Sequence, residues 1–140
     1  MEIRNYRISL RTAGGTDIID LTGDVAGKVR ESEVRNGHAL VFVPGATGAV
    51  TTIEYEPGLI RDLKEAVERL LPGNRVYHHD ERWGDGNGHA HLRAAFLGPS
   101  VTVPVVDGRL VLGTWQQIVF IDFDTRPRDR SLLVQISGNL

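Results

Sequence analysis

Residues 80–99, DERWGDGNGHAHLRAAFLGP, form a polar loop that runs directly into an Ala-rich segment. Asn87 is a predicted helix N-cap, because its side-chain oxygen can accept hydrogen bonds from the unpaired N–H groups of a first helical turn. Gly98-Pro99 predicts the end of that helix. The stretch therefore predicts one short helix, with His89 and His91 in its first turn.

The start of this helix favours a binding site. Its partial positive charge suits an anionic ligand and lowers the pKa of a nearby imidazole. His89 and His91 would share a face of a strand, which is a common spacing for metal ligands, but in a helix they lie about 200° apart. The alternative is one buried and one exposed histidine behind a capping asparagine. The neighbouring Asp85 and Asn87 favour the functional interpretation.

The chain after this helix has the pattern of β-structure. Short runs rich in β-branched residues alternate with turn residues, and Asp107-Gly108 is typical of a tight hairpin turn. Four strands in antiparallel succession are predicted, over Val101–Val106, Arg109–Leu112, Gln116–Phe123 and Leu132–Ser137.

The chain before this helix mixes both kinds of element. Alternation predicts a strand over residues 2–11, with Thr16–Leu21 as its hairpin partner across Gly14-Gly15. Thr22 or Asp24 is expected to cap a short helix that ends near Glu33.

Further strands and one clear helix follow this first part. The predicted strands are His38–Val43, Ala49–Tyr55 and a short one over Arg75–His78. Pro57 opens an amphipathic helix, expected to pack on the sheet and to end at Pro72-Gly73. The whole pattern is α+β, a mostly antiparallel sheet with about three helices in a single domain of residues 1–140.

The composition narrows the function classes. A net charge of −2 gives no electrostatic case for binding nucleic acid. The chain has no cysteine, so a metal ion would need His, carboxylate or carbonyl ligands. No apolar run is long enough for a membrane span and the first residues are too polar for a signal peptide, so we expect a cytoplasmic protein without a membrane partner.

Two other segments offer groups for chemistry. Glu54 and Glu56 can hold a divalent cation or act as acid and base, although stabilising the start of the following helix explains them equally well. Trp115 can stack on a planar ring whose edge Gln116 hydrogen-bonds; the alternative is a bulge with Trp115 in the core.

Three arginines stand close together near the end of the chain, at positions 126, 128 and 130. Guanidinium groups bind phosphate through two parallel hydrogen bonds, so the run predicts a phosphate site. A solvated hairpin turn is the alternative.

Taken together, these motifs strongly resemble the YjbQ family, whose members are described as secondary thiamine-phosphate synthases. The resemblance runs in order over nearly the whole chain, and the Asn-x-His-x-His and Gly-Thr-Trp-Gln blocks are its most specific parts. The matching motifs are Val41-Phe-Val-Pro44, Glu54-x-x-Pro57, Asp62-Leu63, Tyr77-x-His79-Asp80, Asn87-Gly-His-Ala-His-Leu92, Gly98-Pro-Ser100, Gly113-Thr-Trp-Gln116, Phe123-Asp124 and Arg126-Pro-Arg-x-Arg130.

This resemblance implies a layered, bifurcated sheet and a homotrimer with sites near the subunit contacts. It also implies a reaction that joins hydroxymethylpyrimidine diphosphate to thiazole phosphate and releases pyrophosphate, with a divalent metal, Mg²⁺ or Zn²⁺, held by His89 and His91. The catalytic residues expected from the motifs are His89, His91, Glu54 and Asn87. The residues expected to bind the small phosphorylated substrate are Thr47, Asp85, Trp115, Gln116, Arg126, Arg128 and Arg130.

One departure from the family bears on activity. Members carry His-Thr-Thr where this chain has Gly45-Ala46-Thr47, so one histidine of the family site is missing, and His79 can replace it only if the fold brings it close. Three hypotheses follow: an enzyme of this type with reduced or altered activity, a non-catalytic protein that binds a metal or a phosphorylated ligand, and an assembly protein whose histidines only cap and pack.

Overall fold

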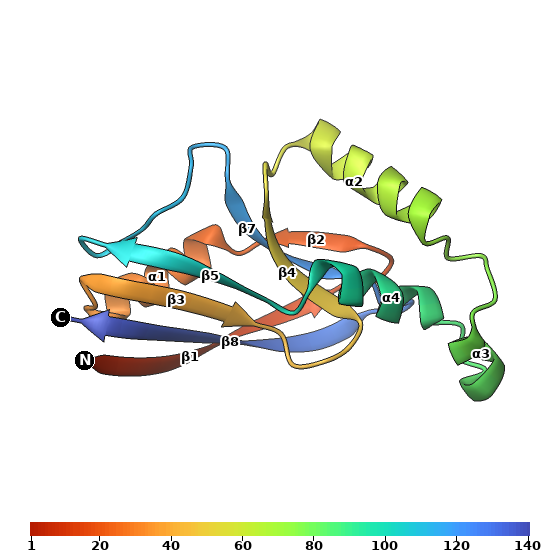
Figure 1. Cartoon of the computed structure of the whole chain (residues 1–140), viewed down its shortest axis with the longest axis horizontal. Coiled ribbons are helices and arrows are strands. Elements are labelled where there is room, and N and C mark those ends of the chain that lie inside the picture. Colours follow the sequence, from red (N-terminus) through yellow and green to blue (C-terminus); the bar gives the residue numbers. More distant parts are fainter.

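The computed structural model describes residues 1–140 and divides the strands between two antiparallel sheets (Figure 1). The five-stranded sheet has the order β1-β8-β3-β5-β6, and the three-stranded sheet has the order β2-β7-β4. The strands are β1 (Glu2–Thr12), β2 (Asp17–Asp20), β3 (Asn36–Phe42), β4 (Gly48–Ile53), β5 (Ser100–Val106), β6 (Arg109–Leu110), β7 (Gln117–Asp122) and β8 (Arg128–Asn139). The α+β class with a mostly antiparallel, layered sheet is confirmed.

Strand β7 is buried on both faces and joins two hydrophobic cores. Ile118 and Phe120 belong to the larger core, which lies beneath the five-stranded sheet and α1 (Thr22–Ser32). Val119 and Ile121 point the other way, into a smaller core shared with α4 (Gly88–Leu97). Because alternate residues of a strand face opposite sides, the unbroken apolar run in β7 supplies both cores at once.

The predicted strand pairings are partly wrong. A strand does form within residues 16–21, as β2 (Asp17–Asp20), but it pairs with β7 instead of turning back on β1, whose partner is β8. The four C-terminal strands are not in antiparallel succession either, because β7 lies in the other sheet and β8 lies between β1 and β3. Both errors concern long-range pairing, which the local alternation of a sequence does not specify.

Four helices are present, one more than expected. The extra one is α3 (His78–Trp83), so the short strand predicted over Arg75–His78 is wrong. Helix α2 (Pro57–Leu70) begins at Pro57 as predicted and packs on the smaller core through Ile60, Leu63 and Val67, but it leaves Leu70 exposed. None of the helices is long and apolar enough to cross a membrane.

Candidate functional site

Asp80 joins the two helices that carry most of the predicted histidines. One oxygen of its carboxylate accepts a hydrogen bond from the Tyr77 N–H at 3.0 Å, at the start of α3, and the other accepts from the Gly88 N–H at 2.9 Å, at the start of α4. Asn87 occupies the N-cap position of α4 but caps no N–H with its side chain, so that prediction is corrected. These two N–H donors lower the pKa of Asp80 and keep it ionised.

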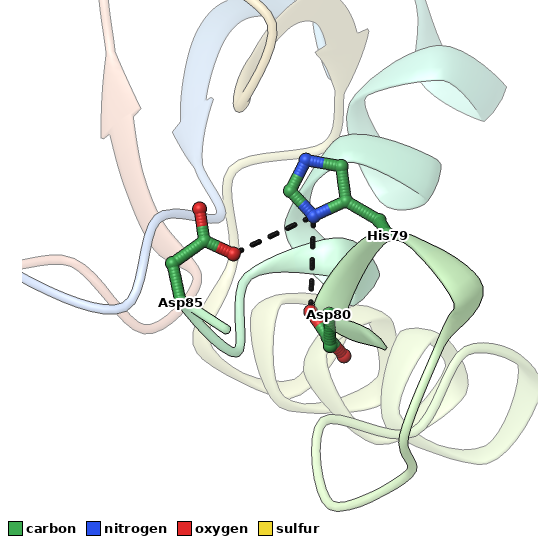
Figure 2. A group of neighbouring side chains, drawn as sticks. All are labelled: His79, Asp80 and Asp85. Atoms are coloured by element: carbon green, nitrogen blue, oxygen red, sulfur yellow. Dashed lines mark ion pairs between the residues drawn. The ribbon is translucent and has the colours of Figure 1, made fainter. Parts of the chain in front are cut away.

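A cluster of one imidazole and two carboxylates lies at this helix junction (Figure 2). Nδ1 of His79 lies 3.5 Å from a carboxylate oxygen of Asp85 and 3.8 Å from one of Asp80. The same Nδ1 is buried and makes no hydrogen bond. One ligand atom from each of the three residues lies within 4.8 Å of the others, which is the spacing of a shared cation.

His91 lies on the side of α4 that faces this cluster. Its ring centroid is 4.5 Å from that of His79. It also lines a cavity of about 300 Å³ whose wall includes Gly45, Ala46 and Gly48. The fold therefore brings His79 close to His91, beside the loop that contains Gly45.

His89 points away from His91, as the helical spacing predicts. It is buried against the end of α2, where its Nε2 lies 3.5 Å from the place that a Cβ on Gly73 would take. Burial, and then the nearby Arg93 charge, lower the pKa of His89, so its ring is neutral at pH 7. The two predicted metal ligands thus lie on different sides of α4 within one chain.

A second group of polar residues, which we call the arginine end, lies where β4 begins and β7 ends: Thr47, Asp122, Asp124 and Arg130. Arg130 binds both oxygens of Asp122 at 2.9 Å and donates to the Thr47 hydroxyl at 2.8 Å. The Thr47 hydroxyl in turn donates to Asp124 at 3.1 Å. Burial acts to raise the pKa of Asp122, but hydrogen bonds from Arg130 and Thr12 outweigh it and the pKa is lowered.

The arginine end changes the interpretation of the three-arginine run. Arg130 is paired with Asp122, and Arg128 is paired with Asp124 at 3.1 Å. Their charges are already balanced inside the chain, whereas Arg126 is exposed and forms no ion pair. Arg130 and Thr47 instead hold the loop that forms one wall of the His91 cavity.

The predicted residues Glu54, Trp115 and Gln116 lie at the other end of strands β4 and β7. We call this the tryptophan end: Thr52, Tyr55, Trp115 and Gln116. The Gln116 amide donates to the Thr52 hydroxyl at 3.2 Å, and the Tyr55 N–H donates to the side chain of Gln117 at 2.8 Å. Trp115 is 74% exposed in the β6–β7 loop, which excludes the alternative of a core tryptophan.

The two ends are well separated within one chain. Gly48 pairs with Asp122 and Ile53 pairs with Gln117, so five residue steps of β4 separate the ends, or about 17 Å at the usual rise of a strand. Glu54 follows Ile53 and is exposed at the tryptophan end, away from His91, which lines the cavity beside Gly48. Figure 1 shows α4 beside the start of β4, and the β6–β7 loop near its end.

Several residues of the site were not singled out from the sequence. Asp80 was noted only within a motif, although its position three residues after Tyr77 is a signal for a helix cap. Arg93 was not considered: it is 4% exposed and binds Glu68 at 2.7 Å and the Leu71 carbonyl, tying α4 to the end of α2. Nothing in the local pattern distinguishes this buried arginine from an exposed one.

Comparison with known proteins gives a consistent result. The family model described as UPF0047 protein YjbQ-like matches residues 6–139. A UPF0047 protein of Archaeoglobus fulgidus is 44% identical over 128 residues, which cover 91% of this chain and 97% of that protein. The UPF0047 protein YugU of Bacillus subtilis is 32% identical and covers 94% of this chain and 97% of its own length.

Solved structures agree with this sequence similarity. A hypothetical protein from Aeropyrum pernix K1 superposes with a TM-score of 0.90 at 34% identity, covering 97% of this chain and 99% of that one. A YbjQ-like protein of unknown function from Sulfolobus solfataricus P2 gives a TM-score of 0.88 at 32% identity, covering 99% and 100% of the two chains.

Proposed function

Because this chain belongs to the UPF0047 YjbQ-like family, we propose that it is a weak thiamine-phosphate synthase. The thiazole nitrogen attacks the methylene carbon of hydroxymethylpyrimidine diphosphate, the carbon–oxygen bond to the diphosphate breaks, and its electron pair leaves with pyrophosphate. The observation that carries the proposal is the cluster of His79, Asp80 and Asp85 beside the cavity that His91 lines.

A divalent cation fits this cluster. The orphaned Nδ1 of His79 points at two carboxylates, so a cation would give a buried polar atom the partner that it lacks. One imidazole with two carboxylates suits Zn²⁺ better than Mg²⁺, which prefers oxygen ligands and water. Bound there, the cation would supply Lewis-acid stabilisation of the charge on the departing pyrophosphate.

The chain's own residues have distinct roles in this proposal. His79 and Asp85 would hold the cation, and Asp80, which caps both helices, has lone pairs left that could contribute. His91 hydrogen-bonds a phosphate oxygen from the cavity wall. Arg130 is a positioning residue, since it acts on the cavity only through Thr47 and the loop before β4.

The reaction also needs a flat surface for the pyrimidine, and Trp115 with Gln116 are the candidates. They lie at the tryptophan end, about 17 Å along β4 from the cavity. We therefore propose a homotrimer in which the tryptophan end of one protomer faces the His91 cavity of the next. Head-to-tail contacts form a ring when the rotation between neighbouring protomers closes.

Direct assay tests the activity. Thiamine phosphate formation from the two substrates should depend on added Zn²⁺ or Mg²⁺, and His79→Ala or Asp85→Asn should reduce it more than about tenfold. His78→Ala is the matched control, because the neighbouring His78 is fully exposed and lies outside the cluster. Equal activity of His79→Ala and wild type would refute the assignment.

A mixing experiment tests the shared site. Trp115→Ala and His79→Ala are each expected to be inactive, but co-refolded in equal amounts they should recover activity. Random assortment leaves about one quarter of the shared sites intact. No recovery would show that the site does not combine the two ends of neighbouring chains.

A second candidate function is binding without turnover. Gly45 favours it, because the wall of the His91 cavity there has no side chain that could transfer a proton. Gly45 also has φ 139°, and a Cβ would lie 3.3 Å from Arg130, so the loop is not built for a larger residue. Saturable binding of hydroxymethylpyrimidine diphosphate with no product would support this function, and any turnover that depends on His79 would exclude it.

A further inference from the structure

A separate and larger cavity, of about 620 Å³, lies between α1 and the β5–β6 hairpin. Its apolar lining comes from Ala26, Val29, Val34, Leu110 and Leu112, and Val29 and Val34 belong to the main core. The volume lies within the range of small-molecule sites, roughly 300–1,000 Å³. Figure 1 shows α1 and the tip of β5 at the opposite end of the molecule from α3.

The walls of this cavity are held in place by the backbone. The Gly108 N–H donates to the Arg35 carbonyl at 2.9 Å, which ties the hairpin turn to the segment after α1. The Arg35 N–H donates to the Asn139 carbonyl at 2.7 Å, which ties that segment to β8. The cavity therefore exists before any ligand arrives, and binding does not require the chain to reorganise.

The rim of the cavity carries more positive than negative charge: Arg30, Arg35 and Arg109 against Glu33 and Asp107. Arg35 and Asp107 form an exposed pair at 3.6 Å, which contributes little. Arg30 and Arg109 form no ion pair. Two guanidinium groups are thus free to bind an anion above an apolar floor.

From this combination we propose that the cavity binds a small organic anion, with its apolar body against Val29 and Leu110 and its carboxylate or phosphate between Arg30 and Arg109. The apolar body of such a ligand would contact the apolar lining, and its negative charge would pair with the two arginines that have no partner in the chain. This site is independent of the proposed synthase function, because it shares no residue with the His91 cavity.

Amide chemical-shift mapping with 1-naphthyl phosphate as the probe tests the proposal. Saturable shifts are expected at residues 26–35 and 107–112. Removal of a charge-assisted hydrogen bond should raise the Kd about tenfold in either Arg30→Gln or Arg109→Gln. Arg61→Gln is the control, since Arg61 is exposed on α2 and forms no ion pair.

The neutral analogue 1-naphthol separates charge from apolarity. It should bind at least about tenfold more weakly if the arginines hold the anion. Equal binding of 1-naphthol, shifts confined to the His91 cavity, or no saturable shift around α1 would each overturn the proposal. Shifts confined to the His91 cavity would place the phosphate of the probe at the proposed synthase site. Thiamine phosphate formation is measured separately, so failure here is distinguishable from failure of the synthase assay.

Discussion

The two ends of strands β4 and β7 differ sharply although they belong to the same sheet. At the arginine end, Asp122 is completely buried and its charge is neutralised by Arg130 through two hydrogen bonds. At the tryptophan end, Trp115 lies in a loop held by hydrogen bonds between exposed side chains, and its indole is mostly in solvent. The buried charge of the arginine end is therefore paired within one chain, whereas the indole at the tryptophan end is left exposed.

This difference separates residues that stabilise the chain from residues available for a ligand or a neighbour. A buried charge must be paired, so truncating one partner leaves the other uncompensated. Removing an exposed aromatic ring changes the free energy of unfolding only slightly. The sequence motifs predicted one site that contains residues of both ends. In the structure, the residues of the arginine end stabilise the chain, and those of the tryptophan end are available for a ligand or a neighbour.

The largest expected effect is that of Arg130→Met. It leaves Asp122 buried without its cation and removes a donor to Thr47, so the free energy of unfolding should fall by about 3–5 kcal/mol. Urea denaturation followed by circular dichroism measures it. Arg126→Met, four residues away and exposed, is the control and should change stability by less than about 0.5 kcal/mol. Equal effects of the two variants would mean that the Arg130–Asp122 pair does not stabilise the arginine end.

A smaller loss is expected for Arg93→Met, which removes the contacts of α4 to Glu68, Thr16 and the Leu71 carbonyl. Glu68 is half-exposed and can be solvated, so the cost should be about 2 kcal/mol, less than for Arg130. Arg69→Met on α2 is the matched control. Faster amide exchange over residues 68–73 in Arg93→Met would locate the loss at the end of α2, and unchanged exchange would argue against it.

Acid should weaken the arginine end. The folded-state pKa values of Asp122 and Asp124 are lowered by their hydrogen bonds, so the unfolded chain binds more protons as the pH falls through the unfolded value near 3.8. The stabilisation that these two carboxylates give is present above that pH and is lost below it. For each carboxyl, the free energy of unfolding falls by no more than about 1.4 kcal/mol per pH unit.

Denaturation of wild type and Arg130→Met between pH 5.5 and pH 3 measures this contribution. The wild type should lose more stability over this range, because the variant no longer lowers the pKa of Asp122 by the Arg130 hydrogen bonds. Parallel pH curves would mean that the carboxylates elsewhere in the chain account for all of the acid sensitivity.

The parts predicted correctly from the sequence are those set by local patterns. Pro57 and Gly98-Pro99 mark helix ends by backbone chemistry alone, and the two-residue spacing of His89 and His91 separates them on any helix. The partner of β2 and the burial of Arg93 depend on residues far away in the chain. The arginine run predicted a phosphate site although Asp124 stands only four residues before Arg128, because the sequence does not show that Asp122 and Asp124 face Arg130 and Arg128.

The smallest effect is expected for Trp115→Ala, and it tests the tryptophan end directly. At low protein concentration the free energy of unfolding should change by less than about 0.5 kcal/mol, since the indole contacts little of its own chain. Phe120→Ala, in the neighbouring strand β7 and fully buried, is the control and should cost about 3–5 kcal/mol. If a second protomer covers Trp115, the loss should grow with protein concentration, because association stabilises only the wild type. A large loss that is independent of concentration would instead mean that Trp115 packs on its own chain.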